Sequence, residues 1–140
     1  MKRLTVKLVL PLTIISFVVI TKWWLVKIVD APDETLTGFP LPFVCRAWNT
    51  SMAFQFFIAA FMVDFLFYFL CWFGLIFVTN RYLISIKPYK IVTVIWWCLA
   101  ALVIFGADVL ALNKNNIFYF KRPFEIETIA SGVSLLGNKL

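Results

Sequence analysis

The chain has 140 residues, of which 63% are hydrophobic, 19% aromatic and only 14% charged, and its mean hydropathy is +0.94. Soluble domains average about 45–50% apolar and about 25% charged residues, so this composition indicates a bilayer protein and excludes a separate soluble catalytic domain. The net charge is +6, but the basic residues cluster at the ends of apolar runs, where lipid phosphates lie. We therefore expect no nucleic acid as a partner.

The first expected element is a membrane helix over residues 5–26. Three basic residues near the N-terminus precede an apolar run from Leu8 to Ile20, and a basic, aromatic cluster follows this run in place of a cleavage site. This arrangement predicts an uncleaved signal anchor.

A long loop is expected next, over residues 27–51. Four helix-breaking residues, Pro32, Gly38, Pro40 and Pro42, exclude a continuous helix there. Its apolar side chains let it pack as a cap on the helix ends, and the alternative is that this loop carries function.

Two further spans are expected over residues 52–78 and 91–112, joined by a turn at 79–90. The first of the two has no Pro, no basic residue and one acid, and as a helix of about 27 residues it would be about 40 Å long. Because the connection is short, the two helices are expected to pack as an antiparallel hairpin. The turn and the N-terminus carry basic residues without acids, which places both in the cytoplasm and the loop outside.

The tail, residues 113–140, is expected outside the membrane and is too short and too polar to cross it. Its apolar residues fall on one side of a helical wheel, which predicts an interfacial helix; they are Ile126, Ile129, Val133, Leu136 and Leu140. The predicted fold is thus an all-α integral membrane protein of the plasma or inner membrane. It has three transmembrane helices, an extramembrane cap loop and an interfacial C-terminal helix.

Asp64 is the sharpest chemical signal in the sequence. A carboxylate near the bilayer centre costs at least about 2.5–3.5 kcal/mol, so it needs a partner. Counting along the helices at 1.5 Å per residue places Lys22 and Asp108 at similar depth, and Tyr68 lies one turn from Asp64 on the same face. The sequence therefore predicts an intramembrane polar cluster of Lys22, Asp64, Tyr68 and Asp108.

Two interpretations of this cluster remain open. In one, it conducts, binds or relays a proton; in the other, its charge contacts fix helix packing or engage a partner subunit. The second is preferred, because three short helices are too few to enclose a water-filled path. Four tryptophans are expected as anchors at the membrane interfaces: Trp23, Trp24, Trp96 and Trp97.

The sequence predicts neither a metal site nor a cofactor. It has no histidine, and its three cysteines form no Cys-x-x-Cys pair. It also shows no paired acids at one depth and no nucleophile beside a base, so no enzyme is expected.

The predicted function is a small non-enzymatic accessory or structural subunit of a membrane complex. Its expected partners are the lipid bilayer and either other membrane subunits or a second copy of the chain. The alternative is a component of an ion or small-solute pathway that uses Asp64 and Lys22 after assembly.

Overall fold

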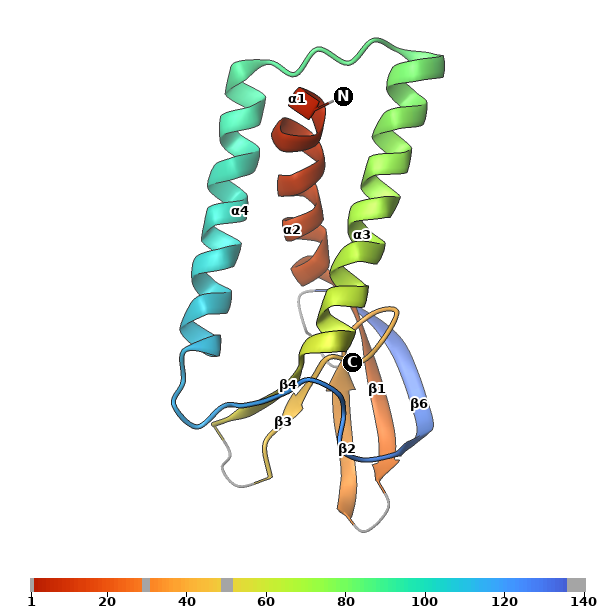
Figure 1. Cartoon of the computed structure of the whole chain (residues 1–140), viewed down its shortest axis with the longest axis vertical. Helices are drawn as coiled ribbons and strands as arrows, with labels where there is room; N and C mark the ends of the chain where they lie inside the picture. Colours follow the sequence, from red (N-terminus) through yellow and green to blue (C-terminus); the bar gives the residue numbers. More distant parts are fainter. Residues whose placement is uncertain (1, 29–30, 49–51, 136–140) are drawn as a thin grey trace.

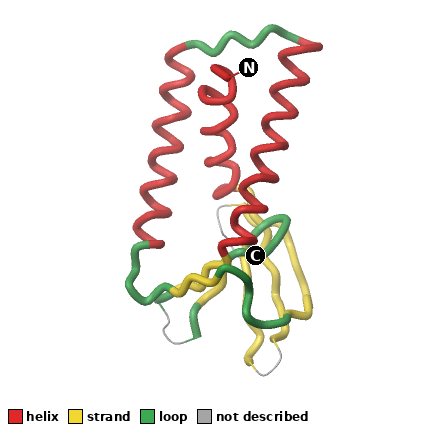
Figure 2. Tube along the Cα trace, in the orientation of Figure 1, coloured by secondary structure: helices red, strands yellow, loops and turns green. Residues whose placement is uncertain are grey.

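The structure divides into a helical end and a sheet end. In the computed structural model, which describes residues 2–28, 31–48 and 52–135, the helices gather at one end and a six-stranded sheet lies at the other (Figure 1). Figure 2 shows the same division between helix and strand. The expectation of an all-α protein is therefore wrong, and the fold is mixed α/β. Parts of the predicted loop and tail, at residues 29, 30, 49–51 and 136–140, lie outside the described residues.

Three helical segments form the bundle. Two of them, Ile58–Leu83 and Lys90–Ala111, are long and apolar enough to cross a membrane, each with a mean hydropathy of 2.2, whereas Thr5–Val19 is a shorter apolar helix. The first segment runs without a break through α1 (Lys2–Leu4), the π-helix η1 (Thr5–Val9) and α2 (Leu10–Val19). The second consists of α3 (Ile58–Val78) and the π-helix η2 (Thr79–Leu83). The third is α4 (Lys90–Ala111).

The N-terminal helix lies between the other two. α2 packs against both α3 and α4, so these helices face each other across α2 instead of forming the expected two-helix hairpin (Figure 1). Pro11, Thr13 and Ser16 of α2 are all buried, and at 100° per residue they lie on more than one side of the helix, which agrees with its position between two neighbours. The Trp97 indole of α4 also donates a hydrogen bond to the Val6 carbonyl at 3.2 Å.

The first predicted span is wrong from residue 20 onward. α2 ends at Val19, and the chain continues as strand β1 (Ile20–Ile28) in place of a helix reaching residue 26. This strand consists of β-branched and aromatic residues, one leucine and two lysines, a composition that suits a pleated sheet as well as a membrane interface. It forms antiparallel ladders with one strand on each side, which satisfies its backbone groups.

The sheet joins strands from both ends of the sequence. Its order is β5-β4-β3-β2-β1-β6, and neighbouring strands are antiparallel except for the parallel pair β4 and β5. Two strands occupy the predicted loop, and a third precedes α3, so the helix begins at residue 58 instead of 52. The remaining strands are β2 (Ala31–Thr37), β3 (Val44–Arg46), β4 (Phe54–Phe57), β5 (Ile117–Tyr119) and β6 (Ile126–Leu135).

The expected interfacial helix of the tail is strand β6. Ile126, Ile129 and Val133 are β-branched, and β6 pairs with β1 from Ile126 to Leu135 with one register shift next to Ile129. The other two residues of the expected helix, Leu136 and Leu140, lie outside the described residues. Gly132 lies opposite Trp23 in this ladder, and a Cβ at residue 132 would come within 2.8 Å of the indole ring. The glycine that weakens a helix therefore makes room for a large aromatic neighbour.

A compact apolar core lies under the sheet. Val26 and Ile28 of β1 pack with Leu36, Cys45 and Phe57, one from each of the next three strands. All five side chains are buried. Ala60 in the first turn of α3 packs against this core, so the core also contacts the bundle.

Candidate functional site

Asp64 lies at the junction between the bundle and the sheet. Because α3 begins at Ile58, this residue is about 9 Å along the helix from its sheet end, well away from the helix midpoint. Its side chain is fully buried, and Oδ1 accepts a hydrogen bond of 2.9 Å from the Leu41 backbone N–H. Within the described part of the chain, Oδ2 has no hydrogen-bond partner. The carboxyl group therefore fastens α3 to the loop at residues 38–43.

That loop is in turn fastened to β1. The Gly38 N–H donates to the Lys22 carbonyl at 2.9 Å, and the Trp24 indole N–H donates to the Gly38 carbonyl at 2.8 Å. Gly38 has a φ of 149°, a conformation that side-chain-bearing residues rarely adopt, and a cis peptide bond joins Phe39 to Pro40. The loop thus connects the strand to the helix through the hydrogen bonds of Gly38 and Leu41.

Tyr68 makes a second connection one turn farther along α3. Its hydroxyl donates a hydrogen bond to the carbonyl of Ile20, the residue at which α2 ends and β1 begins. Its ring also packs edge-on against Phe17 of α2, with ring centroids 5.8 Å apart. Asp64 and Tyr68 are therefore both buried on the same side of α3, where each holds a different part of the adjoining chain.

The other two members of the predicted polar cluster lie elsewhere. The Lys22 ammonium sits 3.7 Å above the centroid of the Trp24 ring in a cation–π contact and makes no ion pair with Asp64 in the described structure. Asp108 is exposed near the sheet end of α4, on the far side of the N-terminal helix. The structure thus brings together two of the four residues, and the buried carboxylate is met by a backbone N–H in place of a lysine.

The four predicted tryptophan anchors belong to two parts of the molecule. Trp23 and Trp24 lie in β1. Trp23 packs over Gly132, and Trp24 donates a hydrogen bond to the loop at residues 38–43. Trp96 and Trp97 lie in α4, and the second bonds to the N-terminal helix. At least three of the four therefore have contacts inside the molecule.

A polar contact between α2 and α3 was missed by the sequence reasoning. The Trp72 indole donates to Ser16 Oγ at 2.8 Å, and that hydroxyl donates to the Thr13 carbonyl at 3.2 Å. Thr13 Oγ1 in turn donates to the Val9 carbonyl. The spacing of Thr13 and Ser16, three residues apart in an apolar helix, is the signal that could have identified this face.

The sheet holds one buried thiol. The pKa of Cys45 is raised to about 12, mainly by burial; the nearby Glu34 charge acts in the same direction and Arg122 in the opposite one. Burial also lowers the pKa of Arg122, whose Nε donates to the Phe124 carbonyl at 3.0 Å. A thiol with so high a pKa stays protonated and is not a nucleophile at neutral pH. Its Sγ approaches Gln55 Oε1 at 3.9 Å.

The arrangement at the junction is suited to holding elements together. Across the described residues, no group of three or more His, Cys, Asp or Glu side chains is placed to hold a metal ion.

No family model matches the chain, and neither the curated proteins nor the solved structures include a match to it.

Proposed function

We propose that this chain is an integral membrane protein that presents a small sheet at the membrane surface and serves as a non-enzymatic structural or accessory subunit. The observation that carries the proposal is the exposed apolar surface of α4. Its large side chains Leu102, Phe105 and Val109 are 68%, 69% and 60% exposed. Side chains of this kind on a helix of 22 residues suit contact with lipid or with other membrane helices.

The distribution of charge supports a sidedness for this arrangement. The end of the bundle that carries the N-terminus and the connection at residues 79–90 has basic residues and no acid in its sequence. The sheet end carries both signs of charge. By the positive-inside rule, the first end faces the cytoplasm and the sheet faces outward across a plasma or inner membrane.

A structural role is supported by the contacts of the buried polar groups. Asp64 and Tyr68 bond to the backbones of the loop and of β1, so both act as tethers. The pathway interpretation gains no support from the geometry, because Lys22 lies over Trp24 and not beside Asp64.

Membrane insertion and sidedness can be tested with two cysteine variants of matched exposure. Met52 on the sheet side is 78% exposed, and Leu83 at the other end is 72% exposed. In a background with Cys71→Ala and Cys98→Ala, a membrane-impermeant maleimide should label Met52→Cys in intact cells and Leu83→Cys only after lysis. The reverse pattern would invert the sidedness, and release of the chain by alkaline carbonate would refute membrane insertion.

The subunit role requires a separate measurement. The full-length chain, purified in mild detergent, should run as a complex of fixed stoichiometry with another membrane subunit or with itself, because α4 leaves most of its apolar surface uncovered. A chain that is stable as a monomer and binds no other subunit would contradict this part of the proposal. Measured mass in detergent, corrected for bound detergent, distinguishes these outcomes.

A further inference from the structure

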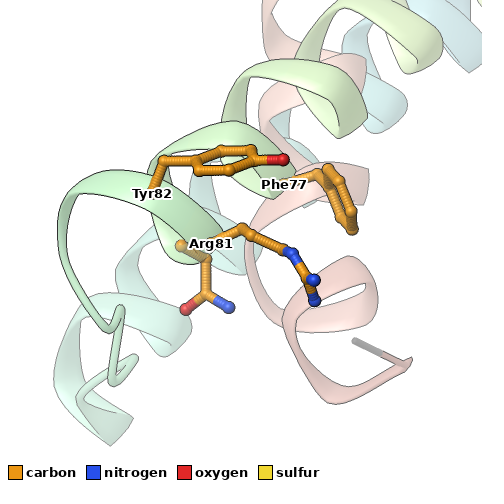
Figure 3. A pocket seen from close by; sticks show the side chains of 4 residues that line it. Phe77, Arg81 and Tyr82 are labelled. Atoms are coloured by element: carbon orange, nitrogen blue, oxygen red, sulfur yellow. The ribbon is translucent and has the colours of Figure 1, made fainter.

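A hollow of about 620 Å³ lies at the end of the bundle opposite the sheet. It is lined by Phe77 from the last turn of α3 and by Asn80, Arg81 and Tyr82 from η2 (Figure 3). It is an open hollow and not an enclosed cavity, so a ligand there would be covered only in part. The hollow is separate from the junction around Asp64, because it lies at the other end of α3.

The local backbone explains why these side chains meet. Phe77 and Arg81 are four residues apart, so they lie on the same face of the helical segment. The Asn80 side-chain oxygen accepts a hydrogen bond of 2.9 Å from the Ile86 N–H, which holds the following connection against the π-helix. Figure 3 shows the Arg81 and Tyr82 side chains extending from η2 toward the side that carries Phe77. π-helical turns of this kind are frequent at functional sites.

The charge of this end favours an anion. The sequence contains no acid between Asp64 and Asp108, nor among its first 29 residues, so the acids of the sequence lie toward the sheet end. Arg81 is exposed and forms neither an ion pair nor a hydrogen bond to another described side chain. A guanidinium matches the oxygens of a phosphate through two parallel hydrogen bonds. The side-chain amide of Asn80 and the hydroxyl of Tyr82 are further donors at the rim.

We propose that this hollow binds the phosphate-containing headgroup of an anionic phospholipid. The inference rests on the proposed membrane insertion, which places the end of α3 at the level of the headgroups. Lipid is favoured over free phosphate because the aromatic rings of Phe77 and Tyr82 line the hollow beside Arg81, and the next two residues of the chain, Leu83 and Ile84, are large, apolar and exposed. A headgroup can meet the guanidinium while its glycerol and acyl carbons meet these apolar groups.

The test uses the full chain in mild detergent with native mass spectrometry. Added phosphatidylglycerol should remain bound where phosphatidylcholine does not, and Arg81→Gln should weaken its retention by roughly tenfold through the loss of charge-assisted hydrogen bonds. Lys90→Gln removes one charge from the same end outside the hollow and is the matched control. Arg81→Lys keeps the charge but loses the two parallel N–H donors of the guanidinium, so the lipid retention of this variant should be intermediate.

Three results would overturn the inference. The first is equal retention of the two lipids, and the second is an equal loss in the Arg81→Gln and Lys90→Gln variants, which would indicate diffuse attraction only. The third is displacement of the lipid by inorganic phosphate at equal concentration, which would indicate a free anion as the ligand. Carbonate extraction of the same variants keeps the two proposals apart: release from membranes with selective lipid binding in detergent would refute insertion and leave the site standing.

Discussion

Removing the Asp64 carboxyl should weaken the attachment of the sheet to the helical bundle and lower the free energy of unfolding. In Asp64→Ala the Leu41 N–H loses its acceptor, and a fully buried side chain is replaced by a smaller one. A hydrogen bond to a charged acceptor contributes about 1.5–3 kcal/mol, and the cavity adds to the loss, so we expect about 2–4 kcal/mol of destabilisation. For a chain of this length that lowers the Tm by roughly 10 °C.

The matched variants separate hydrogen bonding from charge. Asp64→Asn keeps an oxygen that can accept from Leu41 and replaces the oxygen that has no partner, so its cost should stay within about 1 kcal/mol. Asp108→Ala removes an exposed carboxylate and should change the stability by less than about 0.5 kcal/mol. Thermal unfolding in detergent, followed by tryptophan fluorescence, measures all three. The tether is refuted if Asp64→Ala unfolds at the temperature of Asp108→Ala, and equal losses in Ala and Asn would assign the effect to charge.

Three further predictions concern the sheet end. Gly38→Ala should destabilise strongly, because its φ of 149° and a crowded backbone oxygen exclude a Cβ, whereas Gly74→Ala, with nothing within 4 Å, should leave the Tm unchanged or raise it. Gly132→Ala should lower the Tm, and a smaller ring from Trp23→Phe in the same chain should recover part of the loss. Cys45 should resist maleimide at pH 8 in the folded chain and react in denaturant. Since its pKa rises on folding from 9.0 to about 12, its contribution to stability is fully present below pH 9 and declines as pH rises toward 12; Cys45→Ala should lack this decline.

Long apolar runs predicted helices well, and short ones did not. The helix expected at residues 91–112 is found as Lys90–Ala111, because an apolar run of that length without Pro forms a helix and is too long for a strand. The run around residues 20–28 is short, and its lysines and tryptophans suit a membrane interface and a strand equally. As a strand it pairs with the adjacent β2 and with β6, which lies more than 90 residues away in the sequence. No local pattern contains the second of these partners.

The candidate site was predicted in part for a related reason. A lone acid in an apolar helix indicates burial, and Asp64 is buried. Its partner could not be read in the same way, because the donor is the backbone N–H of Leu41, and every residue except proline carries such a group. Opposite charge points to Lys22, whose ammonium instead lies over the ring of Trp24, two residues along the same strand.

The pairing of β1 with β6 constrains how the chain can be threaded. β1 to β4 precede α3, while β5 and β6 follow α4, yet all six strands belong to one sheet and must lie on one side of any membrane. α3 must therefore carry the chain away from the sheet and α4 must return it, whether or not the shorter N-terminal helix also crosses. Until α4 is in place, β1 lacks a hydrogen-bonding neighbour along one edge. Under the proposed membrane insertion, sheet completion thus depends on the correct insertion of both long helices, and folding of the sheet would be linked to assembly in the bilayer.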